Sequence, residues 1–215
     1  MNPIASFFST LLASRTQAHI YHWQTPSDAA HRALGVYYEK IIDIISQMDS
    51  LKIKDTSTGL LNSWQMLKTI GNKLSDIKQI GSTILSVTSE QFKNSQNLLS
   101  KFTSNLSLTV TNALISDISS LTPTNSHLTL SKIELKDSSA NVGANFDSIA
   151  ANTKVTKVTI KDPSNPFTLT ASQYTSSKID FLTKVQDNNY SVSITGLDST
   201  TSKQVGSDNR VKSIA

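Results

Sequence analysis

The sequence predicts an α+β fold, in which an N-terminal antiparallel αα-hairpin is followed by two βαββαβ-type repeats and a C-terminal strand. Three observations lead to this prediction. The first 50 residues show helical periodicity, the remainder alternates as strands do, and residues 51–113 match residues 133–197 in order. A match of this length indicates two copies of one supersecondary unit.

The two copies are related by a shift of 82 positions. Trp64 then aligns with Phe146, and Leu85 aligns with Phe167. After two single-residue insertions, Leu-Ser-Leu-Thr-Val-Thr (106–111) aligns with Tyr-Ser-Val-Ser-Ile-Thr (190–195). We therefore expect five segments, namely a hairpin at 1–50, repeat one at 51–113, a connector at 114–132, repeat two at 133–197 and a tail at 198–215.

The first segment predicts two helices. Residues 3–24 and 28–48 both have the apolar spacing of an amphipathic helix, and the Pro26 region between them breaks the pattern. Two helices joined by a tight turn form an antiparallel αα-hairpin, which here would bury Phe8, Leu12, Ile41 and Ile45. Such a pair is half of a four-helix bundle and leaves apolar surface exposed, so we expect it to assemble with other subunits.

Each repeat predicts the element order βαββαβ. The elements expected in copy one are a strand at 51–54, a capped helix up to Ile70, strands around Ile77 and at 84–87, a second capped helix up to Phe102, and a strand at 106–110. Copy two repeats this order, with Pro163-Ser164-Asn165-Pro166 as a turn. The acidic residues Asp55 and Asp137 stand at helix starts, where capping explains them.

The segments outside the copies also have a pattern. Ile115, Ile118 and Leu121 predict a short helix in the connector. The end of the tail, 209–215, resembles 130–134, where copy two begins. The tail therefore predicts the opening strand of a partial third repeat, and that strand should add to the sheet edge of copy two or of a neighbouring subunit.

Composition excludes several classes of protein. The chain has 215 residues, of which 37% are hydrophobic and 17% are charged, so it is neither disordered nor short of a core. It has no cysteine, which excludes disulfides and thiolate metal sites. No apolar run approaches the ~18 residues of a membrane helix, and we expect neither a membrane span nor a signal peptide.

The net charge of +4 comes from lysines scattered along the chain rather than clustered in a basic run. Because nucleic-acid binding favours clustered cations with stacking aromatics, we expect no nucleic-acid partner. The sequence also lacks a P-loop, a Gly-x-Gly-x-x-Gly, a Gly-x-Ser-x-Gly and a His-Glu-x-x-His motif. We therefore predict that the protein is not an enzyme and that it has no catalytic residues.

The hairpin carries three of the four histidines. Ser14–Thr25, Ala30–Leu34 and Tyr37-Tyr38-Glu39 resemble the first helix pair of a ferritin-like family, related to the Dps miniferritins and found in tailed bacteriophages. The resemblance implies metal ligands at His22, His31, Glu39 and Asp43, with Fe or Zn as the metal. The alternative is that the histidines make structural hydrogen bonds, because the second helix pair of a ferritin bundle is missing and leaves too few ligands in one chain.

Both repeats resemble a module of large secreted bacterial proteins of the RTX and adhesin type. The resemblance is carried by Asp137-Ser138-Ser139-Ala140-Asn141-Val142 and Leu169-Thr170-Ala171-Ser172-Gln173-Tyr174. It implies a scaffold without chemistry of its own, and no calcium-binding nonapeptide is present.

The two resemblances together favour a structural protein of a phage virion. In this reading the protein decorates or connects the capsid or tail, assembles with itself or with other virion or surface proteins, and uses the hairpin for docking. Two alternatives stay open, a ferritin-like metal-binding protein and an extracellular adhesion protein at a cell surface.

Overall fold

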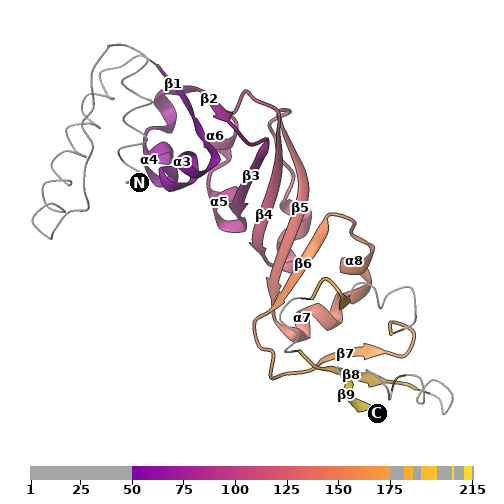
Figure 1. Ribbon diagram of the computed structural model, residues 1–215. Coiled ribbons are helices and arrows are strands. Elements are labelled where there is room, and N and C mark those ends of the chain that lie inside the picture. The colour runs from indigo at the N-terminus through magenta and orange to yellow at the C-terminus, as the bar shows by residue number, and fades with distance from the viewer. Residues whose placement is uncertain (1–49, 175–181, 186–189, 198–204, 206–210, 215) are drawn as a thin grey trace, which may run out of the picture. The chain divides into compact units, whose positions relative to one another are not determined.

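The fold is described by a computed structural model, which covers residues 50–174, 182–185, 190–197, 205 and 211–214 (Figure 1). In this part of the chain short helices alternate with strands, which confirms the predicted mixture of helices and strands. Both predicted hairpin helices, 3–24 and 28–48, lie outside the described residues. The chain divides into two compact units. The described part of unit 1 comprises 50–85, 93–107 and 123–129, and that of unit 2 comprises 86–92, 108–122 and the residues from 130 onward.

Copy one has the predicted order of elements. They are β1 (Leu51–Thr56), α3 (Ser57–Asn62), α4 (Trp64–Thr69), a 3-10 helix (Gly71–Lys73), β2 (Leu74–Ile80), β3 (Ile84–Thr88), α5 (Ser89–Asn94), α6 (Gln96–Leu99) and β4 (Leu106–Ala113). Each predicted helix is in fact two short helices. At Ser63 the backbone leaves helical geometry (φ −98°, ψ 9°), although Ser63 N still donates to Gly59 O and Leu67 N to Ser63 O. The chain therefore bends while its hydrogen bonds continue.

Copy two follows the same order as far as it is described. Its elements are β5 (Leu128–Asp137), α7 (Ser139–Ala144), α8 (Phe146–Ala151), β6 (Val155–Ile160), β7 (Phe167–Thr170) and β8 (Val192–Thr195). The connector holds a 3-10 helix (Ile115–Ser120), where a short helix was expected. β5 begins five residues before the predicted start at Ile133, because Leu128 and Leu130 are buried and alternate with exposed Thr129.

The strands form parallel ladders in which each strand pairs with one that follows a crossover. The sheets have the orders β1-β2, β3-β4-β5-β6 and β7-β8-β9. Leu51 pairs with Leu74, Ile133 with Val155 and Phe167 with Val192, all in parallel. For β3 and β4, Ser107 N donates to Thr83 O and Thr111 Oγ1 to Val87 O, so the contacts advance in the same direction along both strands. Parallel neighbours require a long crossover, which the short helices provide.

β5 serves both copies. Its first half lies beside β4, since Ser131 Oγ donates to Leu108 O. Its second half begins the β6 ladder, where Ile133 N donates to Lys154 O. One continuous strand therefore closes copy one and opens copy two.

The repeat is also visible in the hydrogen bonds that start its helices. In copy one Thr56 N donates to Asp55 Oδ1 (2.7 Å) and Gly59 N to Thr56 Oγ1 (3.1 Å). In copy two the same two bonds, at 2.8 and 3.3 Å, join the residues 82 positions later, Asp137, Ser138 and Asn141. Thr56 and Ser138 are thus equivalent N-caps, at the capped helix starts that the sequence predicted.

The second helix of each copy starts in the same way. Thr88 N donates to Gln91 Oε1 and Gln91 N to Thr88 Oγ1, which is a capping box. Thr170 and Gln173 make the same reciprocal pair in copy two. In copy two the described residues that follow, 171–174, form a turn, and residues 175–181 lie outside the described residues.

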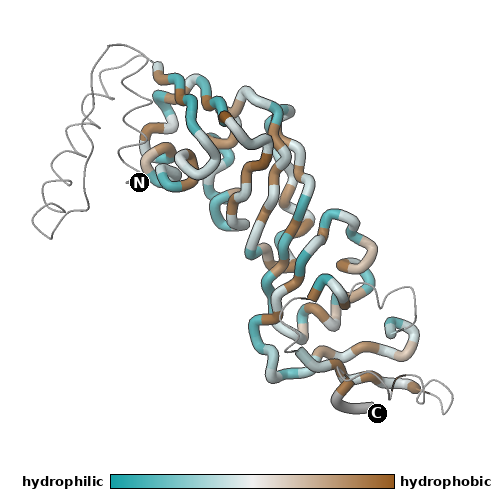
Figure 2. The backbone as a smooth tube through the Cα atoms, viewed as in Figure 1, coloured by the Kyte–Doolittle hydropathy of each residue, from teal (hydrophilic) through white to brown (hydrophobic). Residues whose placement is uncertain are grey.

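The core consists of equivalent apolar positions in the two copies. Apolar and polar residues alternate along the strands, as Figure 2 shows, and the apolar ones are buried. The buried equivalents are Leu51 and Ile133, Ile53 and Leu135, Leu60 and Val142, Trp64 and Phe146, Leu67 and Ile149, Leu85 and Phe167, Val87 and Leu169, Phe92 and Tyr174, Leu108 and Val192, and Val110 and Ile194. In unit 1 Trp64 Nε1 donates to Ser95 Oγ (3.0 Å), so the indole keeps a partner when buried.

The tail forms the strand β9 (Val211–Ile214), which pairs in parallel with β8. Val211 lies opposite Val192, and Ile214 lies opposite Ile194. The prediction that the tail adds a strand to the sheet of copy two is confirmed. Val192 and Ile194 correspond to Leu108 and Val110, which neighbour β5 in copy one, so β9 takes the place that β5 takes there.

Deletion of residues 211–215 should therefore destabilise unit 2. β8 would lose its backbone partners on one side, and Val192 and Ile194 would gain exposure. Chemical denaturation should show a lower unfolding midpoint for the truncated chain than for the full chain. Equal midpoints would show that the β8–β9 ladder contributes no stability.

Gly143 permits the closest approach between a helix and a strand in unit 2. A Cβ atom built on Gly143 would lie 2.8 Å from Thr168 O and 3.1 Å from Thr168 N, which are both backbone atoms of β7. Real Cβ contacts are not this short, so α7 packs against β7 only because residue 143 has no side chain. A Cβ on Gly71 in unit 1 meets only Asn97 Nδ2, at an ordinary 3.6 Å.

We predict opposite outcomes for the same substitution at these two glycines. Gly143→Ala forces α7 away from β7 and should cost about 1–3 kcal/mol, the usual range for overpacking. Gly71→Ala is sterically free and should be neutral or stabilising by up to about 1 kcal/mol, because alanine restricts the unfolded chain. Urea denaturation of both variants tests the pair. Equal stability of the two variants would contradict the close approach.

Candidate functional site

The metal ligands suggested by the hairpin resemblance lie outside the described residues. This holds for His22, His31, Glu39 and Asp43 alike. Within the described residues no group of three His, Cys, Asp or Glu side chains could hold a metal ion. His127 is exposed and hydrogen-bonds through Nδ1 to Asn105 Oδ1 (2.9 Å), which ties two loops of unit 1 together.

Three hydrogen-bonded carboxylates lie in unit 2, at the ends of successive strands of the four-stranded sheet. We call the carboxylates Asp117, Asp137 and Asp162 the carboxylate ladder. Asp137 is the last residue of β5, whereas Asp117 and Asp162 follow β4 and β6, and each accepts a hydrogen bond from the first residue of the helix that follows the preceding strand. Asp117 and Asp137 are buried.

Asp117 forms the first rung. Ser89 Oγ, just after β3, donates to Asp117 Oδ2 (2.8 Å), and both residues are buried. Leu114 N donates to the same oxygen (3.2 Å). The rung joins the start of α5 to the 3-10 helix after β4.

Asp137 forms the second rung and accepts three hydrogen bonds. Ile115 N donates to Oδ2 (2.9 Å), while Ser138 N and Asn141 Nδ2 donate to Oδ1 (2.8 and 2.9 Å). Burial raises the pKa of Asp137, but these bonds and the charge of Lys161 outweigh burial and hold the pKa below its ordinary value. Asp137 is therefore ionised near neutral pH.

Asp162 forms the third rung. Ser139 donates to it twice, from N (2.6 Å) and from Oγ (3.1 Å), and Asn165 Nδ2 donates at 3.1 Å. The backbone bond from Ser139, followed by the bond from Asn165, holds the pKa of Asp162 below its ordinary value. Asn165 N also donates to Asp162 O (2.9 Å), which closes the predicted turn around Pro163.

The hydrogen bonds of these carboxylates indicate a structural role. Both carboxylate oxygens of Asp137 and of Asp162 already accept hydrogen bonds from the protein. Such oxygens are poor metal ligands and poor bases, because a new partner would first have to displace a charge-assisted bond. Instead, they accept hydrogen bonds from backbone N–H groups that would otherwise have no partner at the end of a strand.

In copy one the equivalent strand end is held by the side-chain amide of Gln79 and not by a carboxylate. Gln79 takes the register position that Ile160 takes in copy two, and it is buried. Its Nε2 donates to Ser82 O (2.6 Å) and Ile84 O (2.9 Å), which holds the turn around Gly81. Gly81 has a φ of 84°, a value that glycine adopts without strain.

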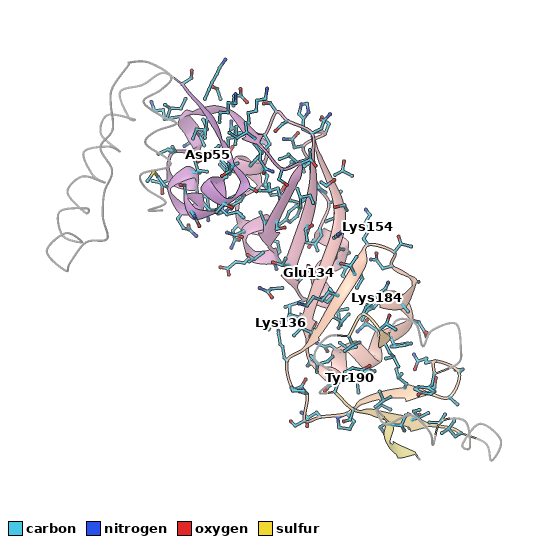
Figure 3. The ribbon with its side chains drawn as sticks, in the orientation of Figure 1. Asp55, Glu134, Lys136, Lys154, Lys184 and Tyr190 are labelled. Atoms are coloured by element: carbon cyan, nitrogen blue, oxygen red, sulfur yellow. The ribbon has the colours of Figure 1, made fainter. Side chains whose placement is uncertain are left out.

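Asp55 is the equivalent of Asp137 and is packed against Gly59. A Cβ on Gly59 would lie within 2.5 Å of all three carboxyl atoms of Asp55. Figure 3 shows Asp55 on the β1 side of unit 1. Sequence reasoning assigned Asp55 and Asp137 to helix caps. The N-caps are instead Thr56 and Ser138, and each aspartate precedes its N-cap and accepts a hydrogen bond from the N-cap N–H.

Sequence reasoning missed Ser89, Asp117 and Asp162 as a connected set. The sequence gives only a weak indication of this set. Each residue follows an apolar strand, where Ser and Asp are also typical of ordinary turns and helix caps. Their connection depends on parallel pairing, which the strand pattern alone does not specify.

Comparison of the chain with protein-family models, with curated proteins and with solved structures finds no match. No helix in the described part is both long and apolar enough to cross a membrane. Function must therefore be inferred from the residues and from the geometry of the repeats.

We predict that Asp137→Asn destabilises the protein by about 2–3 kcal/mol near neutral pH, because it removes hydrogen bonds to an ionised group. The pKa of Asp137 is depressed in the folded state, so the carboxylate contributes fully above its unfolded pKa of about 4. That contribution is lost as pH falls through the lower folded pKa, where the two proteins should converge.

Denaturation of both proteins from about pH 7 to about pH 2 measures this difference. The control is Glu90→Gln, which removes one carboxylate from an exposed position and should change stability by less than about 0.5 kcal/mol. A difference that stays constant down to the lowest pH would exclude the charged form of Asp137 as its source.

Proposed function

We propose that this chain is a non-enzymatic structural protein in which the two repeats act as a scaffold. The hairpin of residues 1–50 is the docking element in this proposal. The protein works within a larger assembly, together with copies of itself or with other structural proteins. The preferred setting is a phage virion, as a decoration or connector of the capsid or tail.

The observation that carries the proposal is the use of the buried polar groups in the repeats. Thr56, Thr88 and Ser138 cap helices, Thr170 makes the bonds equivalent to those of Thr88, and the carboxylate ladder joins the residues that follow β3 to β6. Enzymes keep reactive groups within reach of a substrate. Here these polar groups are engaged in holding the backbone, which favours a scaffold.

The pairing of β9 supports the scaffold proposal. β7, β8 and β9 lie in one parallel ladder, and β5 is shared between the copies. Units that pair with the next unit along a common ladder form stiff arrays, because each interface is a continuous set of hydrogen bonds and apolar contacts. Stiff spacers suit proteins that hold partners apart or extend from a surface.

The virion setting rests on the resemblance of the hairpin to a ferritin-like domain of tailed phages. The same resemblance keeps the metal-binding alternative open at His22, His31, Glu39 and Asp43, with Fe or Zn. The resemblance of the repeats to secreted RTX and adhesin modules keeps the alternative of an extracellular adhesion protein open. Iron-dependent absorbance after loading with Fe(II) separates the metal alternative, since a scaffold has no reason to oxidise iron.

We predict that mass spectrometry of particles purified from the source will find this chain at the level of the structural proteins. A virion component co-purifies with particles through density-gradient centrifugation. A secreted adhesin remains in the particle-free supernatant or on cells, so recovery of the chain only there would overturn the virion proposal. The matched control is the chain without its first 50 residues, which should fold but should not join the particles.

A further inference from the structure

One face of unit 1 combines lysines with exposed isoleucines. We call it the Lys–Ile face and define it by Lys52, Lys54, Lys78, Ile80 and Ile84. The three lysines are exposed on the outer sides of β1 and β2, whose alternate residues Leu51, Ile53 and Ile77 are buried. Ile80 continues the outer row of β2, and Ile84 follows after one turn.

The lysines on this face are close together and outnumber the carboxylates beside them. Lys54 lies directly opposite Lys78 in the parallel register, an arrangement of like charges that costs stability. Asp76 lies opposite Lys52, but its carboxylate also accepts a hydrogen bond from Thr103 Oγ1. Within the described part of the chain, none of the three lysines makes an ion pair. With three lysines and one carboxylate, the face presents a net positive charge.

Ile80 gives this face an exposed apolar residue at its end, and Ile84 adds a second one across the turn. Ile80 and Ile84 are 37% and 48% exposed, and they are the exposed large hydrophobic residues of the described part of the chain. Both flank the turn at Gly81, which projects into open space, since a Cβ there would meet nothing within 4 Å. Single exposed apolar residues are common, but two on one turn beside a lysine cluster indicate a binding surface.

We propose that the Lys–Ile face docks peripherally on an anionic phospholipid surface. Lysine ammonium groups are attracted to anionic headgroups, and each contributes about a fivefold increase in binding. The isoleucines of the turn then enter the boundary between headgroups and acyl chains, where apolar side chains are favoured. The contact goes beyond the scaffold role and requires no membrane-spanning segment.

A nucleic acid fits this face less well. Residues 51–197 contain no arginine, so the bidentate contacts that phosphates and bases favour are missing. The described aromatic residues are not among the exposed large hydrophobics, so none offers a platform for base stacking. Exposed isoleucines add nothing to the binding of a soluble polyanion, whereas they add directly to the binding of a lipid surface.

Sedimentation with vesicles tests the proposal on the full chain. The probes are vesicles of phosphatidylcholine alone and of an equimolar mixture with phosphatidylserine. Wild type should bind only the mixed vesicles, and binding should weaken with added salt. The variant Lys52→Gln/Lys54→Gln/Lys78→Gln should bind about a hundredfold more weakly, as expected for three lysines. Ile80→Ser/Ile84→Ser should also lose binding at constant charge.

The matched control is Lys132→Gln/Lys136→Gln/Lys154→Gln, which removes the same charge from exposed positions of unit 2. Lys136 and Lys154 are labelled in Figure 3. This variant should keep most of the binding, and melting temperatures no lower than that of the wild type should show that all variants fold. Absence of vesicle binding by wild type, or an equal loss in the control, would overturn the proposal. Full binding by Ile80→Ser/Ile84→Ser would also overturn it, because the face would then recognise anions in general.

Discussion

Parallel pairing is the constraint on which the rest of this structure depends. A strand cannot reach a parallel neighbour through a tight turn, so the chain must leave the sheet and return along its length. The short bent helices provide that return, and they must begin immediately after a strand ends. The ends of β1, β3 and β5 therefore each carry a helix start with unpaired backbone N–H groups. The N-caps Thr56, Thr88 and Ser138 start these helices, and the carboxylate ladder accepts hydrogen bonds from further backbone N–H groups.

The two copies show that this requirement can be met by different residues. Copy two uses Asp162, which binds Ser139 at the next helix start, whereas copy one uses Gln79, which binds the carbonyl groups of its own turn. The ionised carboxylate of Asp162 accepts a hydrogen bond from a backbone N–H group, whereas the side-chain amide of Gln79 donates hydrogen bonds to backbone carbonyl groups. The two residues therefore satisfy opposite kinds of backbone group. The hydrogen-bonding need is therefore kept at this corner while the residue type changes. At the buried equivalent positions the residue type also changes, while the apolar character is kept.

The order of elements could be predicted from the sequence because it depends on local signals. Buried residues such as Ile53 and Leu85 alternate with exposed ones, and Thr88 and Gln91 are spaced as a capping box. Strand direction and the carboxylate ladder could not be predicted, because both depend on which strands become neighbours. The early start of β5 was missed for the same reason. In the sequence alone, Leu128-Thr129-Leu130 is typical of the end of a loop. It is recognised as part of a strand only when β4 is known to lie beside it. The helices 3–24 and 28–48 and the ligands His22, His31, Glu39 and Asp43 stay predictions.

The shared strand β5 has a consequence for how such proteins can grow. Where two modules are joined by a linker, every added module needs a new joint that is compatible with both neighbours. Here the joint is the middle of a strand, so a gene duplication that copies one repeat in frame also copies its joint. The tail shows the same geometry, with β9 set against β8 as β5 is set against β4. The length of such a protein can then change by whole repeats without new contacts between them. The distance that the protein spans is then set by the number of repeats.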